Sequence, residues 1–117
     1  MAKHSEFIQF LLEILGPLGD ISACPMFGGY AIRKKRFPFA LVMDDRVYFK
    51  VDDSNRKDYE RAGSKPFTYM ARGKEIVVSN WEVPVDILED DDKLLKWAEK
   101  SYDISVTAKA KKRSKLS

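Results

Sequence analysis

The chain has 117 residues and a mass of 13.5 kDa, which is enough for one domain with a single hydrophobic core. Hydrophobic residues make up 44% and charged residues 33%, as in globular proteins, and no apolar run approaches the ~20 residues of a membrane-spanning helix. The one cysteine, Cys24, excludes an intrachain disulfide and a cysteine-rich zinc site. We therefore expect a cytoplasmic protein without a membrane segment.

Charge is distributed unevenly along the chain. The formal net charge is +3, but the last ten residues contribute +5 and contain no acid, so the other 107 residues carry −2. The five cations of this segment are Lys109, Lys111, Lys112, Arg113 and Lys115. Such a segment repels itself and has little apolar surface to bury, which predicts disorder. We therefore divide the chain into one domain, residues 1–105, and a basic, disordered tail, residues 106–117.

The first predicted element is a helix over residues 7–15. Its apolar side chains recur on one helical face, and Ser5 is a candidate N-cap. Gly16 and Pro17 end the helix, because a residue before proline avoids helical geometry.

Three strands in meander order are predicted next, over residues 30–33, 37–43 and 47–51. Apolar and polar residues alternate in the last of these, as in a strand with one buried face. Basic residues at 33–36 and the two aspartates at 44–45 predict the connecting turns.

The second half of the body predicts a helix, a hairpin and a last helix. Acidic residues open a helix at 52 and Gly63 closes it. Residues 67–70 and 75–81 predict a hairpin, and the acidic run 89–92 predicts the start of the third helix.

The resulting order is α-β-β-β-α-β-β-α. It predicts an α+β fold with two layers, in which helices pack on one face of a five-stranded antiparallel sheet. The opposite face is then left uncovered, either solvated or in contact with a partner. Because such a face favours self-association, and twofold pairs are the commonest oligomers, we expect a protein partner or a homodimer.

No residue pattern predicts a catalytic, metal or cofactor site, so we do not expect an enzyme. Cys24 would need a histidine as base, and His4 lies in an N-terminal segment that is expected to fray. The acids at 89–92 lack the alternate spacing and the glycine of a calcium loop, and are typical of a helix N-terminus. Gly28 and Gly29 match no phosphate-loop pattern and favour a close backbone contact.

A run of four cations could bind a polyanion such as nucleic acid. Cations interleaved with aromatic residues are typical of nucleic-acid surfaces, although a charged hairpin tip is also a common solvated feature that prevents aggregation. The cations are Arg33, Lys34, Lys35 and Arg36, with Phe37, Phe39, Arg46, Tyr48 and Lys50 nearby. The basic tail is a second candidate for the same contact, because Lys/Arg-rich segments bind polyanions without a fold.

Four sequence blocks resemble the N-terminal domain of the TfoX family, in the same order and spacing over about residues 8–102. The blocks are Met26-Phe27-Gly28-Gly29-Tyr30, residues 47–52, Gly63 with Pro66-Phe67-x-Tyr69, and Trp81-Glu82-Val83-Pro84. The resemblance implies an α+β domain with an antiparallel sheet, likened to secretion-chaperone folds, and a link with natural competence. It supplies no catalytic residues. Full-length TfoX-type regulators have a second, C-terminal domain, and this sequence has the basic tail in its place.

The leading hypothesis is therefore a non-enzymatic regulatory module that acts through protein–protein contacts. Direct nucleic-acid binding through the turn at 33–36 and the tail is the alternative, and an enzyme with an unrecognised site is a third reading. We expect the family-signature residues to be structural, with Trp81 filling space between the sheet and the third helix. These residues are Met26, Phe27, Gly28, Gly29, Tyr30, Pro66, Phe67, Trp81 and Pro84.

Overall fold

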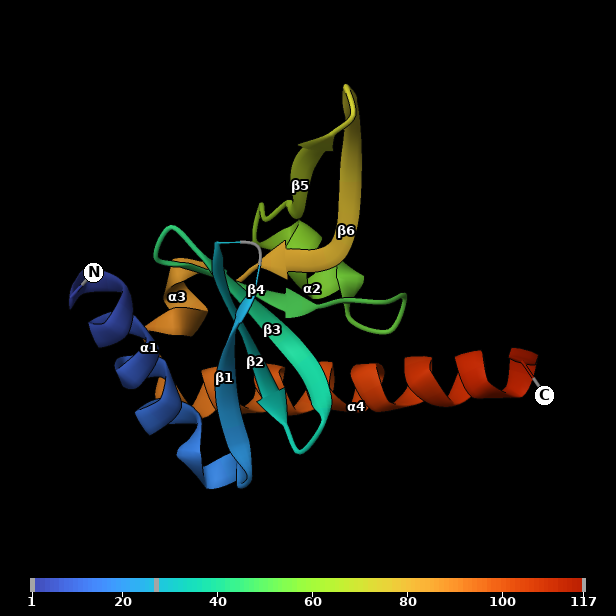
Figure 1. Cartoon of the computed structure of the whole chain (residues 1–117). Coiled ribbons are helices and arrows are strands. Elements are labelled where there is room, and N and C mark those ends of the chain that lie inside the picture. The colour runs from blue at the N-terminus through green and yellow to red at the C-terminus, as the bar shows by residue number, and fades with distance from the viewer. Residues whose placement is uncertain (1, 27, 117) are drawn as a thin grey trace.

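The computed structural model describes residues 2–26 and 28–116, and the side chains of residues 6–26 and 28–108. In this part of the chain, helices pack on one face of an antiparallel sheet, in two layers (Figure 1). The predicted α+β fold class is confirmed. No described helix is both long and apolar enough to cross a membrane.

The sheet has six strands, all paired antiparallel, in the order β1-β2-β3-β4-β6-β5. They are β1 (Ile21–Met26), β2 (Gly29–Lys34), β3 (Phe37–Met43), β4 (Arg46–Lys50), β5 (Pro66–Ala71) and β6 (Lys74–Glu82). The prediction of five strands is wrong because it omits β1. This strand lies at an edge, contains Pro25 and has no fully buried residue, so its sequence lacks the alternation of a half-buried strand.

Tight turns connect β3 to β4 and β5 to β6. Asp44 and Asp45 have φ of 50° and 60°, and Arg72 and Gly73 have φ of 52° and 77°. Two successive positive φ values define the type I′ turn, which matches the twist of a hairpin. The turn predicted at 44–45 and the hairpin predicted over 67–70 and 75–81 are confirmed, and each pair of strands is joined through a two-residue loop.

Helix α1 (Ala2–Leu15) contains the helix predicted over residues 7–15 and begins before it. Ile8, Leu11 and Leu15 are buried against the rest of the core. The α-helix ends where Gly16 and Pro17 begin the 3-10 turn η1 (Gly16–Leu18), as predicted.

The other helices are α2 (Arg56–Arg61), α3 (Val85–Leu88) and α4 (Asp91–Leu116). Helix α4 crosses the sheet behind β3 and β4, and α1 lies beside β1 (Figure 1). The short helix α3 is an element that the predicted order lacks. The predicted acidic start of the last helix is confirmed, because Asp91 and Asp92 form the first turn of α4.

The core lies between these helices and one face of the sheet. Phe39, Val47 and Phe49 project from the strands and pack with Leu11 of α1 and Leu94 of α4 in a single cluster of buried side chains. Each such side chain stabilises the fold by about 1.5–3 kcal/mol when it is removed from water. A β-bulge in β3 lets two consecutive residues face this core, because Ile32 pairs with Ala40 whereas Arg33 pairs with Pro38.

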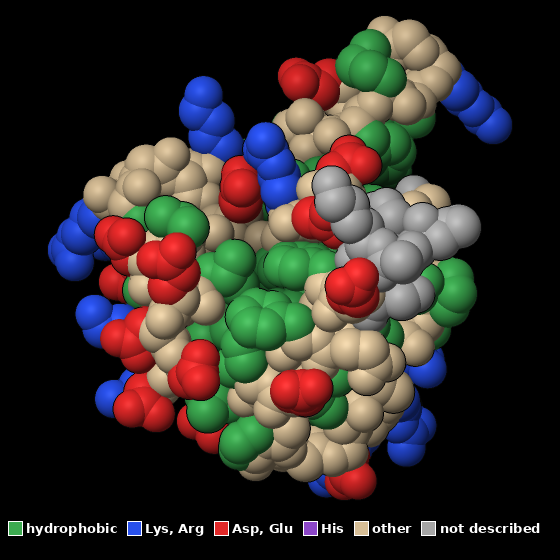
Figure 2. All heavy atoms as spheres, turned by 90° about the vertical axis from the view of Figure 1, so that its left-hand side faces the viewer, with side chains coloured by type: hydrophobic (Ala, Val, Ile, Leu, Met, Phe, Trp, Pro, Cys, Tyr) green, Lys and Arg blue, Asp and Glu red, His purple; other side chains and the backbone are tan. Residues whose placement is uncertain are grey.

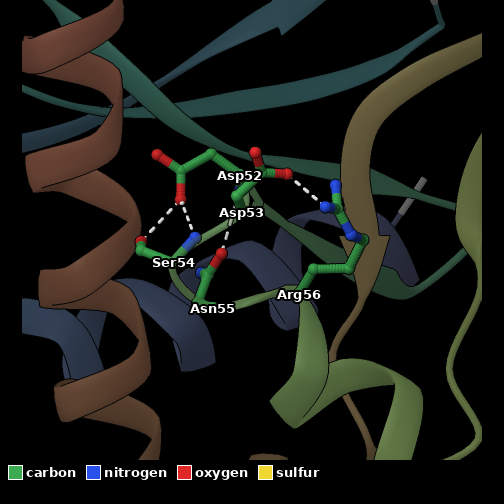
Figure 3. Close-up of polar contacts among 5 residues, drawn as sticks. All are labelled: Asp52, Asp53, Ser54, Asn55 and Arg56. Atoms are coloured by element: carbon green, nitrogen blue, oxygen red, sulfur yellow. Dashed lines mark hydrogen bonds and ion pairs between the residues drawn. The ribbon is translucent and has the colours of Figure 1, made fainter.

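A hydrogen-bonded turn precedes α2 and shifts its start to Arg56, later than the acidic opening predicted at residue 52 (Figure 3). Asp52 Oδ1 accepts hydrogen bonds from the backbone N–H of Ser54 at 2.8 Å and from its hydroxyl at 2.5 Å. Asn55 Oδ1 in turn accepts from the N–H of Asp52 at 2.9 Å, and Asp53 forms an ion pair with Arg56. Asp52 and Asp53 therefore stabilise the loop that precedes α2 and do not belong to the helix itself.

The segment predicted to be a disordered tail is helical in the structure, because α4 continues without a break to Leu116. Residues 106–116 contain alanine, lysine, arginine and leucine, which favour helix, and neither glycine nor proline. Adding residues to an existing helix avoids the cost of nucleation. The prediction of disorder holds for an isolated segment, whereas in the structure residues 106–116 continue a folded helix.

A chain of aromatic rings joins β6, α2 and α4. The ring centroid of Tyr59 lies 6.4 Å from that of Trp81 and 4.6 Å from that of Trp97. Nearby, the Ser101 hydroxyl donates a hydrogen bond to the carbonyl of Lys50 at 2.7 Å. Trp81 thus has the packing role expected for it, although the ring it meets belongs to α2.

We predict that Tyr59→Phe leaves stability near pH 7 within about 1 kcal/mol of wild type, because the ring contacts are kept. Burial raises the pKa of Tyr59 well above 10, and its hydroxyl has no hydrogen-bond partner among the described residues. In wild type the unfolded chain therefore loses this proton at a lower pH than the folded chain, and stability decreases as pH rises above 10. Urea unfolding from pH 8 to 11 should show a shallower decrease for Tyr59→Phe, and identical slopes would contradict the prediction.

We predict that Gly29→Ala destabilises the protein by about 1–3 kcal/mol, as overpacking does. A Cβ at Gly29 would lie 2.1 Å from the carbonyl oxygen of Val42 and 2.5 Å from Sδ of Met43. Gly16→Ala is the matched control, because a Cβ there meets nothing within 4 Å, and it should change stability by less than about 0.5 kcal/mol. Equal urea midpoints for the two variants would contradict the prediction, because they would show that β2 and β3 accommodate the added methyl group without loss of stability.

Candidate interaction surfaces

The four cations predicted to form one basic turn lie in three different environments. Arg33 projects from the sheet face opposite the helices, and its Nε is buried without a hydrogen-bond partner among the described residues. Lys34 points toward the helices, with Nζ 4.7 Å from the centre of the Tyr102 ring, a cation–π contact. Lys35 and Arg36 are exposed at the tip. The four side chains therefore do not form one continuous surface.

The two phenylalanines beside this turn are used for packing. Phe37 meets Tyr102 edge to face, with ring centroids 6.1 Å apart. Phe39 is fully buried and its ring lies 6.1 Å from that of Phe49. Sequence reasoning placed these rings next to the cations but could not show that both rings pack against other aromatic side chains.

The fold nevertheless brings the two predicted basic segments to the same end of the molecule. The Ser105 hydroxyl of α4 donates a hydrogen bond to the carbonyl of Pro38, close to the β2–β3 turn. Lys109 follows one helical turn later, at 1.5 Å of rise per residue. The side chains of Lys109, Lys111, Lys112, Arg113 and Lys115 lie outside the described part of the structure.

The acidic run at 89–92 is a helix start, as predicted. Asp90 Oδ1 accepts a hydrogen bond from the backbone N–H of Lys93 at 3.2 Å, and Asp91 and Asp92 follow in the first turn of α4. Within the described residues, no group of three His, Cys, Asp or Glu side chains is arranged to hold a metal ion.

Cys24 lies in β1 opposite Ala31 and is half-buried. The side chain of His4 lies outside the described residues, so the thiol–imidazole pair considered from the sequence is not tested.

The family-signature residues divide between the core and the sheet face opposite the helices. Gly29 allows β2 and β3 to approach closely, and Pro84 is the N-cap residue of α3. Met26 and Phe67 instead project from the face opposite the helices, where Met26 is exposed and Phe67 half-buried. Phe27 lies outside the described residues. Met26 and Phe67 are therefore accessible to solvent and do not belong to the core.

We call the sheet face opposite the helices the open face, since no described helix covers it. Three rings on it form a row, the aromatic ladder, made of Tyr48, Phe67 and Tyr69. The ring centroids of Tyr48 and Phe67 are 5.0 Å apart, and those of Phe67 and Tyr69 are 6.3 Å apart and nearly parallel. Burial raises the pKa of the Tyr48 hydroxyl, and the carboxylate of Glu82 raises it further. Tyr48 therefore presents a neutral hydroxyl at neutral pH.

A groove of about 190 Å³ continues the open face beyond the ladder. Most of its wall is apolar, and the two polar residues that line it are Lys50 and Asn80. The lining residues are Met26, Pro38, Ala40, Leu41, Lys50, Val78 and Asn80. Sequence analysis missed this groove, because its residues come from four strands and only the register brings them together. The one local signal was the spacing Phe67-x-Tyr69, which places two rings on one strand face.

A second apolar surface lies at the end of the molecule formed by α1 and α3. Figure 2 shows hydrophobic side chains gathered there and surrounded by acidic ones. Phe10 of α1 is 46% exposed and lines a shallow hollow with Glu6 and Glu13, and Val85 of α3 is 62% exposed. This surface has the charge opposite to that of the C-terminal segment of α4.

The comparisons with known proteins agree with this architecture. The TfoX N-terminal domain matches residues 13–105, which include all six strands and most of the described core. Among curated proteins, none matches the chain. The match covers well over half of the sequence, and the chain belongs to the TfoX N-terminal domain family.

Proposed function

We propose that this chain is a non-enzymatic regulatory module of the cytoplasm and that its open face binds a protein partner. The observation that carries the proposal is the continuity of the aromatic ladder with the apolar groove. Exposed aromatic and methionine side chains are enriched where proteins bind one another. A row of rings beside a groove offers the kind of anchor site that contributes most of the binding energy of an interface.

The apolar lining of the groove favours a protein over a nucleic acid as the ligand of the open face. Arg46, the cation next to the ladder on β4, forms an ion pair with Glu82 at 3.7 Å. The chain outside its last ten residues carries a net charge of −2. Arg33 and Lys50 also lie on this face, so the preference for a protein rests on the apolar lining of the groove and not on the charge of the face.

A second candidate function is nucleic-acid binding at the basic end of the molecule. The hydrogen bond from Ser105 to Pro38 favours it, because this contact holds the exposed cations Lys35 and Arg36 next to the basic segment of α4. The two segments would then bind one polyanion together, with an affinity that depends strongly on salt.

The open-face proposal predicts that Tyr48→Ser and Met26→Ser lose a partner that wild type captures from lysates of its own cells. Removing an interface anchor costs about 2 kcal/mol or more, so the captured amount should decrease by tenfold or more. Val85→Ser is the control, because Val85 is apolar and more exposed than Met26 but lies on α3. The proposal would be contradicted if wild type and both open-face variants captured the same proteins. It would also be contradicted if the wild-type protein captured no partner.

The nucleic-acid candidate predicts that truncation after Ala108 weakens DNA binding by tenfold or more, measured by fluorescence anisotropy. Lys35→Ala with Arg36→Ala should cause a smaller loss, since it removes two cations rather than five. The affinity of wild type should decrease with salt with a slope of about −0.9 for each phosphate contacted. Unchanged affinity after truncation, or no binding at low salt, would exclude this function.

A further inference from the structure

The two edges of the sheet differ in how well they are protected. Edge strand β1 contains Pro25, which has no N–H to offer, and α1 packs beside it. Residues 67–71 of edge strand β5 contain neither proline nor a charged residue. An edge of this kind is a template for pairing with another strand.

Strand β5 is also accessible. The β5–β6 hairpin rises above the body and forms the projection at the top of Figures 1 and 2. Apolar side chains are exposed on both of its faces: Tyr69 is 40% exposed on the open face, and Met70 and Val77 are 67% and 63% exposed on the other. Neighbouring exposed hydrophobic side chains of this size are typical of interaction sites.

The turn determines which backbone groups are available at this edge. Ala71 and Lys74 close the two-residue loop as a hydrogen-bonded pair, and hydrogen-bonded and non-hydrogen-bonded pairs alternate along an antiparallel ladder. Thr68 and Met70 therefore direct their N–H and C=O groups away from β6. A second strand can pair with the edge at these two residues.

We propose that the occupant of this edge is the β5 strand of a second copy of the chain, paired antiparallel about a twofold axis at Tyr69. In this register Thr68 of each copy lies opposite Met70 of the other, and both present outward backbone groups. Phe67 lies opposite Ala71, a large side chain against a small one.

The charges agree with this register. Lys65 lies opposite Gly73 of the second copy and Arg72 opposite Pro66, so no two cations are paired across the interface. The two sheets become one, with both open faces on the same side, and the two aromatic ladders form a single row through the paired Tyr69 rings. The inference rests on the proposed function and deepens it, because pairing of the two sheets doubles the area of the open face.

The test replaces the exposed side chains of Thr68 and Met70 by charged ones, because Thr68 of one copy would lie opposite Met70 of the other. Thr68→Lys with Met70→Lys places lysine opposite lysine and should abolish the dimer. Thr68→Lys with Met70→Glu places lysine opposite glutamate and should restore it in this register alone. Sedimentation velocity at up to about 1 mM, where even weak specific pairs form, should give twice 13.5 kDa for wild type and for the Lys/Glu variant. Thermal unfolding checks that both variants fold.

Wild type at 13.5 kDa throughout would overturn the inference, as would a Lys/Lys variant that remains dimeric or a Lys/Glu variant that remains monomeric. Protection of the β5 amides from hydrogen exchange only after another protein is added would assign the edge to that protein and would also overturn self-pairing. Failure here is distinguishable from failure of the proposed function, since Tyr48→Ser and Met26→Ser alter the open face away from this edge.

Discussion

Phe39, Val47 and Phe49 pack between the sheet and the helices, and the rest of the molecule depends on this contact. It fixes which face of every strand is buried, because side chains alternate along a strand and antiparallel pairing carries the same face across the sheet. Phe49 pairs with Ala40 and Trp81 on the buried face. A shift by one residue would expose all of these side chains together.

The same alternation produces the open face. If Val47 and Phe49 point to the helices, Tyr48 and Lys50 must point away from them. Strand β6 pairs with both β4 and β5, so the open face extends to β5. There the ring of Phe67 contacts the ring of Tyr48. The surface proposed for partner binding is thus the opposite side of the pattern that builds the core, and in β4 Tyr48 and Lys50 each lie between buried residues.

Sequence reasoning predicted the elements whose signals are local. The stripe of α1, the alternation of β4 and the two-residue turn at Asp44 all lie within short segments, and all are confirmed. It missed β1 because Pro25 and the edge position remove the usual pattern. It predicted a tail after residue 105 because a helix that continues from a folded segment needs fewer apolar residues than one that forms alone.

The candidate sites were harder to predict because they depend on pairing between distant strands. The sequence showed the cations near Lys34 as one group, whereas alternation sends Lys34 and Arg33 to opposite faces. The contact between Tyr48 and Phe67 joins residues that are far apart in the chain, and no local pattern shows it. The family resemblance supplied the fold class correctly, but it did not separate core residues from those that face outward.

Helices cover one face of the sheet, and the other face presents an accessible aromatic surface. NMR of the dilute protein with a soluble paramagnetic agent tests it most directly, because broadening reports how closely solvent approaches each side chain. The account predicts strong broadening for Tyr69 and Met26 and little for Phe49 and Leu11. Broadening of Phe49, or protection of Tyr69 equal to that of Leu11, would contradict it.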